Sequence, residues 1–146
     1  MILQYNKCEI DEDRSRLDFA RVHGWLSQTY WHTDLTQEIV EKTAKHSSLV
    51  VGCYCNGVQV GYLRVVSDTV RFAYLADVIV DEAYRGRGIG RAMVKFALDH
   101  PDYATVSRWM LATRDAHGVY AGIGFEPLTK PESWMIYVPN PGKQNS

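Results

Sequence analysis

The sequence has no excess of charge of either sign and no long apolar run. Its 146 residues include 16 basic and 17 acidic side chains, which leaves a formal net charge of −1. A chain without a basic footprint is a poor candidate for binding nucleic acid, so we expect no nucleic-acid partner. The apolar runs span only a few residues, far fewer than the roughly 18 that a membrane span needs. We therefore expect no membrane association either.

An export signal and a disulfide framework are also missing. The first residues, Met1–Tyr5, lack the charged region and long apolar core of a signal peptide, which favours a cytoplasmic location. The three cysteines, Cys8, Cys53 and Cys55, are an odd number without a recognisable pairing pattern. We expect them to be reduced, structural thiols. The five histidines do not complete a zinc site with them, so we expect no metal.

Repeats, low-complexity stretches and internal linkers are absent as well. A chain of this length buries roughly 68–70% of its unfolded surface, which is enough for one self-sufficient core. We expect residues 1–138 to form a single domain. Residues 139–146 are polar and rich in turn-forming residues, and we expect them to form a C-terminal tail.

Hydrophobic periodicity predicts a mixture of strands and helices. The expected strands are residues 2–8, 48–55, 58–66, 71–80, 106–113 and 133–138. The expected helices are one that follows Asp11-Glu12-Asp13 and fades near Ser27, one capped by Asp34, one over about 88–99 and one over about 115–121. Asn56-Gly57 lies between two β-rich runs and predicts a tight hairpin. The strand–helix–strand run over 71–113 predicts a parallel pair of strands.

A glycine-rich turn joins a buried strand to an amphipathic helix. It reads Arg85-Gly86-Arg87-Gly88-Ile89-Gly90, and Arg91 follows it. Glycines at such a place indicate unusual backbone angles or the close approach of a ligand, and bare amides at a helix N-terminus bind anions. The Walker loop does not match, and the dinucleotide fingerprint needs glycine where Arg91 stands. The turn predicts a phosphate-bearing ligand; a plain connection between strand and helix is the alternative.

The turn resembles the acetyl-CoA signature Gln/Arg-x-x-Gly-x-Gly/Ala of the GNAT superfamily of N-acyltransferases. Tyr120-Ala121-Gly122-Ile123-Gly124-Phe125 resembles a second landmark of that family, Tyr-x-x-x-Gly-Phe, and the element order is similar over about residues 2–138. The resemblance implies an α/β (α+β) fold with a mixed, mostly antiparallel sheet, a splayed parallel strand pair and flanking helices. It also implies transfer of an acetyl group from acetyl-CoA, as cosubstrate, to a primary amine by direct attack in a ternary complex.

The same resemblance implies roles for particular residues. The amides of the turn, Arg87 to Gly90 above all, would hold the CoA pyrophosphate, and the strand segment Val78-Ile79-Val80 would pair with the pantetheine arm. Many members carry an asparagine that contacts CoA where this chain has Thr113, whose hydroxyl can still form hydrogen bonds. Tyr120 would protonate the departing thiolate. A packed aromatic side chain is the alternative for Tyr120.

The acceptor amine must lose a proton, because a lysine-like amine has a pKa near 10.4. Asp77 is the first candidate base, since it is a carboxylate in an otherwise apolar strand; a salt-bridged structural aspartate is the alternative. His32 is the second candidate, with a pKa near neutrality. Aromatic side chains are candidates for lining the acceptor pocket: Tyr30, Trp31, Phe72 and Tyr74.

Two functions remain open at this point. The first is an N-acetyltransferase acting on a small-molecule or peptide amine, as a monomer or homodimer. The second is a non-catalytic acyl-CoA-binding or regulatory module that has kept the cofactor loop. Tyr120 favours the enzyme, because only catalysis needs a proton donor beside the sulfur. The acceptor is not identified by fold analogy.

Overall fold

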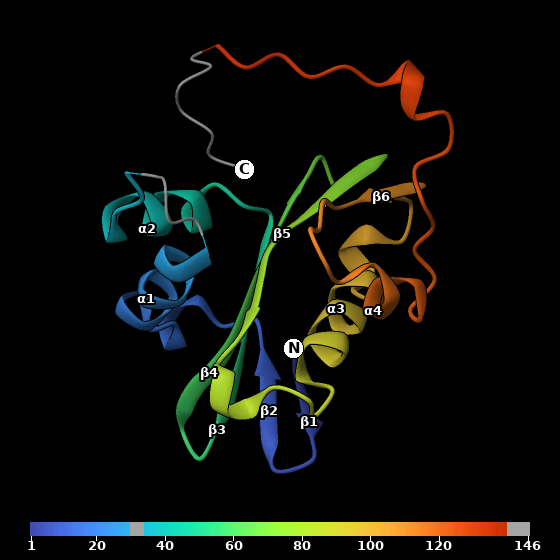
Figure 1. Cartoon of the computed structure of the whole chain (residues 1–146). Coiled ribbons are helices and arrows are strands. Elements are labelled where there is room, and N and C mark those ends of the chain that lie inside the picture. The colour runs from blue at the N-terminus through green and yellow to red at the C-terminus, as the bar shows by residue number, and fades with distance from the viewer. Residues whose placement is uncertain (30–33, 140–146) are drawn as a thin grey trace.

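A six-stranded sheet with helices on both faces organises the chain (Figure 1). The computed structural model describes residues 1–29 and 34–139. The strands lie side by side in chain order: β1 (Ile2–Tyr5), β2 (Cys8–Asp11), β3 (Leu49–Cys55), β4 (Val58–Ser67), β5 (Phe72–Val80) and β6 (Arg108–Met110). All neighbouring pairs are antiparallel except β5 and β6, which are parallel. The predicted mixed sheet with one parallel pair is confirmed.

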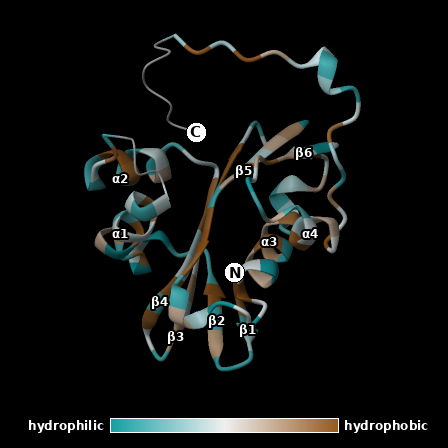
Figure 2. Cartoon of the chain, in the orientation of Figure 1, coloured by the Kyte–Doolittle hydropathy of each residue, from teal (hydrophilic) through white to brown (hydrophobic). Residues whose placement is uncertain are grey.

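The helices divide between the two faces of the sheet (Figure 1). Helices α1 (Phe19–Thr29) and α2 (Gln37–Lys45) cover one face, and α3 (Ile89–Leu98) and α4 (His117–Ala121) lie on the other. Short 3₁₀ segments make up the remaining helical turns: Arg14–Arg16, Glu82–Tyr84, Pro101–Tyr103 and Pro131–Ser133. Figure 2 shows the hydrophobic strands of the sheet between more polar helix surfaces.

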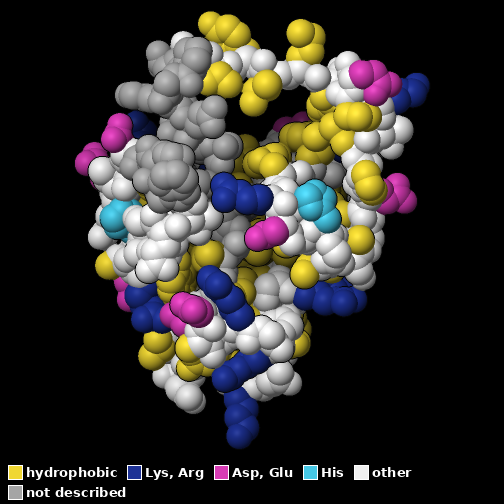
Figure 3. Space-filling view, viewed as in Figure 1, with side chains coloured by type: hydrophobic (Ala, Val, Ile, Leu, Met, Phe, Trp, Pro, Cys, Tyr) yellow, Lys and Arg dark blue, Asp and Glu magenta, His cyan; other side chains and the backbone are white. Residues whose placement is uncertain are grey.

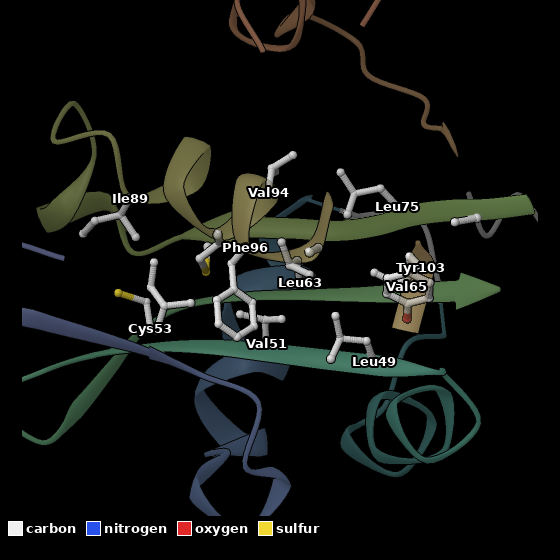
Figure 4. Close-up of a cluster of buried hydrophobic side chains, with 14 of the residues drawn as sticks. Leu49, Val51, Cys53, Leu63, Val65, Leu75, Ile89, Val94, Phe96 and Tyr103 are labelled. Atoms are coloured by element: carbon white, nitrogen blue, oxygen red, sulfur yellow. The ribbon is translucent and has the colours of Figure 1, made fainter. Parts of the chain in front are cut away.

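The larger apolar core lies between the sheet and α3 (Figure 4). Met93 and Val94 of α3 are buried against strand residues such as Val51, Leu63 and Val65. The smaller core lies under α1 and α2, around Val22, Leu26, Val40, Ala44, Val50 and Tyr62. Each fully buried aliphatic side chain contributes about 1.5–3 kcal/mol, so the two cores hold both helix layers on the sheet.

The hairpin predicted at Asn56-Gly57 is confirmed. Asn56 and Gly57 have φ of 52° and 78°, and Cys55 pairs with Val58 across the turn. Two successive left-handed residues are what a two-residue hairpin turn needs to match the twist of its strands. This turn sets the register of β3 and β4.

The first predicted strand is wrong as a single element, because residues 2–8 form a hairpin. Strand β1 ends at Tyr5, Asn6 takes a φ of 54°, and Cys8 begins β2 opposite Tyr5. Asparagine tolerates the left-handed conformation better than most residues. The run 2–8, predicted as one strand, therefore contains a turn whose left-handed residue is this asparagine.

Two predicted helix starts are also corrected. Asp11 belongs to β2, and Asp13 caps the 3₁₀ turn by accepting a hydrogen bond from the Ser15 amide, so α1 begins only at Phe19. The cap of α2 is Thr36 rather than Asp34. The Thr36 hydroxyl accepts from the Ile39 amide at 3.2 Å. Threonine supplies the same capping oxygen that aspartate would, two residues later.

The last predicted strand, residues 133–138, is not part of the sheet. Ser133 ends a 3₁₀ turn, and Trp134–Val138 run as extended, exposed chain. The strand expected over 106–113 is present but shorter, since only Arg108–Met110 pair with β5. Periodicity identified β-forming residues in both places, but a ladder also needs a partner within reach.

The expectation of three reduced thiols is wrong for two of them. Strand β2 places Cys8 directly opposite Cys55, with Cα atoms 4.3 Å apart, and the two form a disulfide. Cys53 is a free, buried thiol, and burial raises its pKa to about 11. The pairing depends on the β2–β3 register, which spacing along the chain does not reveal.

Among residues 1–29 and 34–139, none of the helices has the length and apolar character needed to span a membrane.

Candidate functional site

A β-bulge distorts β5 in the part of the strand that precedes the glycine turn. Tyr62 pairs with Ile79 and Arg64 with Ala76, so Asp77 and Val78 both face the single residue between them on β4. Asp77 takes up the extra length with a φ of 54°. Bulges re-aim side chains and increase local twist, and they are common beside functional sites.

Beyond its first residues, β5 has a backbone edge without a strand partner. Strand β6 pairs only with Phe72, Ala73 and Tyr74, so among the described residues no strand pairs with 75–80 on that side. The segment Val78-Ile79-Val80 lies in this stretch, and its residues are partly buried. An extended ligand with amide groups can bind such an edge as an additional strand does.

The glycine turn leads directly from this edge into α3. Gly86 and Gly88 both have a φ of 79°, the left-handed region that favours glycine. Gly88 is the N-cap of α3 and supplies no side-chain hydrogen bond. The first amides of the helix therefore have no capping side chain, and together with the positive end of the helix dipole they can attract an anion.

Tyr5 stabilises this turn through a hydrogen bond, a contact that the sequence did not predict. Its hydroxyl donates to the Arg87 carbonyl oxygen at 2.8 Å. A Cβ on Gly88 would lie only 2.5 Å from the Tyr5 hydroxyl oxygen, so a larger residue there would displace this hydroxyl and would also be strained by the φ of 79°. A Cβ on Gly90, by contrast, would make an ordinary contact of 3.5 Å with Val80.

The arginines around the turn are held by carbonyl and aromatic contacts. Arg85 Nε donates to the Val80 carbonyl oxygen at 3.1 Å, and the Arg87 guanidinium lies 4.9 Å from the ring centroid of Tyr84. Arg91 donates to the Gly122 carbonyl oxygen at 3.1 Å and so joins α3 to the end of α4. Arg85, Arg87 and Arg91 are exposed, which leaves positive charge beside the bare amides.

Asp81 anchors the start of the turn to α1, and sequence analysis missed this role too. Its carboxylate accepts hydrogen bonds from Arg21 at 3.1 Å, from Trp25 at 3.2 Å and from the Ala83 amide at 2.9 Å. The available sequence signal was its position as a capping aspartate before Glu82–Tyr84. Asp81 therefore fixes the turn relative to the helices on the opposite face.

Tyr120 lies on α4, where the second sequence landmark folds into a compact turn. Gly124, with a φ of 121°, lets the chain reverse so that the Phe125 amide donates to the Tyr120 carbonyl oxygen at 3.0 Å. The two rings meet edge to face, with centroids 5.8 Å apart. Tyr120 is partly buried against the larger core, and this burial raises the pKa of its phenol. The phenol thus stays protonated to a higher pH than a free one.

Thr113 forms a hydrogen bond to Ala116, the N-cap residue of α4. Its hydroxyl oxygen accepts from the Ala116 amide at 3.1 Å. The hydroxyl hydrogen remains available as a donor, since one oxygen can accept and donate at once. Thr113 thus has a structural contact in addition to the cofactor contact that the resemblance implies.

Asp77 is ion-paired. Arg64 Nε lies 2.7 Å from its carboxylate, and the two side chains are 19% and 13% exposed. Arg64 also donates to the Ser47 hydroxyl at 3.4 Å. The ion pair therefore fixes the Asp77 carboxylate at the bulge, next to the open edge of β5.

The proposed acceptor residues divide into described and undescribed groups. Phe72 and Tyr74 alternate along β5 on the same face, and Phe72 is 37% exposed. The intervening Ala73 is buried in the core under α3, so Phe72 and Tyr74 face the layer of α1 and α2. Tyr30, Trp31 and His32 lie outside the described residues.

Comparisons with known proteins agree on one family. The family model described as acetyltransferase (GNAT) family matches residues 10–125. A crystal structure of a GNAT-family protein from Xanthomonas campestris pv. campestris is 40% identical, with a TM-score of 0.84. The match covers 93% of this chain and 96% of that one.

Two further relatives extend this similarity. The thialysine N-epsilon-acetyltransferase of Mus musculus is 27% identical over 136 residues, which are 90% of this chain and 74% of that protein. A GNAT-family acetyltransferase from Brucella melitensis, in complex with acetyl-CoA, is 19% identical with a TM-score of 0.63. That match covers 84% of this chain and 85% of the other. At such low identity the Brucella structure supports the fold alone.

Proposed function

Because the chain belongs to the acetyltransferase (GNAT) family, we propose that it transfers an acetyl group from acetyl-CoA to a primary amine. The observation that carries this proposal is the uncapped N-terminus of α3 immediately after the open edge of β5. An extended amide-containing arm fits the edge, and a pyrophosphate fits the bare amides and nearby arginines. These are the two recognisable parts of coenzyme A.

The acyl transfer forms a carbon–nitrogen bond and breaks a carbon–sulfur bond. The amine nitrogen attacks the thioester carbonyl carbon, and the carbon–sulfur bond breaks to release the thiolate. We assign Tyr120 to donate its phenolic proton to that thiolate, and its raised pKa keeps the proton in place until it is needed. Holding both substrates together supplies much of the rate.

The proton of the attacking amine needs an acceptor, and Asp77 is our first assignment. Its position at the bulge, beside the open edge of β5, and the orientation that the ion pair with Arg64 gives it support a carboxylate that attracts an ammonium group and takes its proton directly or through water. His32 is the second assignment.

Similarity and chemistry together support one class of acceptor. The name of the mouse relative supports a side-chain amine like that of lysine as the first class to test. Phe72 and Tyr74 support an acceptor with an apolar stem, since they offer aromatic surface beside β5.

A thiol-release assay with acetyl-CoA and a panel of amines tests the proposal. We expect CoA release that depends on both acetyl-CoA and one class of amine, with acetylated amine found by mass spectrometry in equal amount. Binding of acetyl-CoA without release for any amine in the panel would favour the non-catalytic module instead.

A further inference from the structure

All three cysteines of the chain meet in the larger core. Cys8 begins β2, and Cys53 and Cys55 belong to β3. Residues two apart in a strand face the same side, and Cys8 pairs with Cys55 across the two strands. The three Sγ atoms consequently all lie within 4.8 Å of one another. We call this group the cysteine trio; it holds one disulfide and one free thiol.

The surroundings of the cysteine trio are apolar. Cys53 is fully buried among the side chains of the sheet and α3, as Figure 4 shows. Gly61 pairs with Cys53, and a Cβ on Gly61 would lie 3.2 Å from the Cys53 Cβ and 3.0 Å from the Met93 Sδ. Met93 of α3 therefore packs beside Cys53. Cys55 is 4% exposed and Cys8 is partly buried, so a small reagent reaches the trio from the Cys8 side.

Charge decides which ligand such a site can hold. Three thiolates leave one negative charge around a divalent cation and none around a trivalent centre, and a buried charge without a partner is unfavourable. Arg16 does not supply that partner, because it lies over the ring of Tyr54, which faces the opposite side of β3. Lys and Arg side chains that Figure 3 shows at the lower end of the molecule lie on its surface. The cysteine trio therefore favours a trivalent, thiophilic centre over a divalent metal ion.

We propose that the reduced cysteine trio binds trivalent arsenic, supplied as arsenous acid, through all three sulfur atoms. Reduction comes first: a dithiol reductant passes two electrons and two protons to the Cys8–Cys55 bond and becomes a disulfide itself. Three thiols then condense with arsenous acid. Three arsenic–sulfur bonds form, three arsenic–oxygen bonds break, and three water molecules leave. Arsenic stays trivalent, and the complex carries no charge.

Three-coordinate arsenic differs from the metal site considered on the sequence. A structural zinc ion needs four ligands, and the histidines do not complete such a set with the cysteines. Trivalent arsenic needs three, which the cysteine trio supplies by itself. Bound arsenic would join β2 to β3 as the disulfide does, so the two states exclude each other. The proposal is independent of the acetyl-transfer reaction.

Native mass spectrometry of the full chain with sodium arsenite tests the site. The chain would be reduced with a phosphine, which has no thiol to compete for arsenic. We expect one arsenic per chain, with a mass gain of one arsenic atom less three hydrogens, because no arsenic–hydroxyl bond remains. The oxidised chain should retain none. The melting temperature of the reduced chain should rise with arsenite, since a ligand that binds the folded state stabilises it.

Cys53→Ala tests the third sulfur. The variant keeps Cys8 and Cys55, so any bound arsenic should retain one hydroxyl group. Its dissociation constant should rise at least about tenfold, because the third bond forms within one molecule at high effective concentration. The matched control is Val51→Ala, which trims another fully buried side chain on the same face of β3 and should bind arsenic as the wild type does.

Four results would overturn the proposal. One is a reduced wild type that binds no arsenic, and another is a wild-type adduct that retains a hydroxyl group. The third is an affinity that Cys53→Ala leaves unchanged. The last is a melting temperature that arsenite fails to raise, because arsenic would then bind the unfolded chain instead of the folded trio.

Discussion

At the scale of residues, two side chains owe their positions to backbone features that are short-range and unusual. Asp77 is turned by the bulge at a positive φ, and Tyr120 is held by the reversal at Gly124. The positive φ of Asp77 costs conformational energy, whereas the reversal after Tyr120 is taken by a glycine. Such features cluster at functional sites, which supports testing these two residues first.

Tyr120→Phe tests the proton donor. The ring and its contact with Phe125 remain, so the melting temperature should change little. Turnover should fall at least about tenfold, because a general acid contributes roughly 10²–10⁴-fold. Since burial raises the phenol pKa, the alkaline fall of kcat in the wild type should lie above the ordinary phenol value near 10. Full turnover in the variant, with its best acceptor, would make Tyr120 a packing residue.

Asp77→Asn tests the base. Without a carboxylate, the reaction depends on amine that has already lost its proton, so the acidic limb of the pH–rate profile should move to higher pH, with acetyl-CoA affinity intact. The variant should also lose about 1–3 kcal/mol of stability, because Arg64 keeps a partly buried charge without its ionised partner. A loss of stability with an unchanged pH profile would assign Asp77 to the salt-bridged structural role and bring His32 forward.

At the scale of elements, the N-terminus of α3 is where sequence and structure agree most closely. Three glycines predicted an unusual backbone, and two of them have a φ of 79°. The Asn56-Gly57 hairpin was equally readable, because both signals are carried by residues whose backbone preference is local. Tyr5, Arg64 and Asp81 were missed, since each acts through a partner distant in the chain.

A pair of substitutions at Gly90, the second residue of α3, tests whether its backbone amide binds the pyrophosphate. Gly90→Pro removes one N–H in the first turn, where a helix tolerates proline because that N–H has no partner within the helix. Gly90→Ala keeps the N–H, and its Cβ would make only an ordinary contact with Val80. By calorimetry, CoA affinity should fall about tenfold or more, roughly 1.4 kcal/mol, in the proline variant. An equal loss in both variants would show that the space, not the amide, matters.

At the scale of the whole molecule, what the sequence left unpredicted is mostly pairing between distant segments. The β2–β3 register that joins Cys8 to Cys55 is one case. The other is the segment 133–138, whose β-forming composition was recognised but which pairs with no strand within residues 1–29 and 34–139. Periodicity reports the tendency of a segment to form a strand, whereas neighbours are chosen by global topology.

The disulfide predicts a stability that depends on redox conditions. It closes a loop with a sequence separation of 47, for which the chain-entropy account gives about 4 kcal/mol. A reductant should therefore lower the melting temperature of the wild type. Cys8→Ser should melt at that lower temperature whether or not reductant is present, while Cys53→Ala should keep the response. A wild-type melting curve that ignores reductant would contradict this.

The contact between Tyr5 and Arg87 spans 82 positions and joins the first strand to the turn that we assign to the cofactor. A ligand that stabilises this turn should also stabilise β1 against local opening, because the Tyr5 hydrogen bond links the two. Amide protons of Ile2–Tyr5 should therefore exchange with deuterium more slowly when CoA is present. Deuterium exchange in β1 would therefore report whether CoA is bound at the glycine turn, which β1 contacts through the Tyr5 hydroxyl.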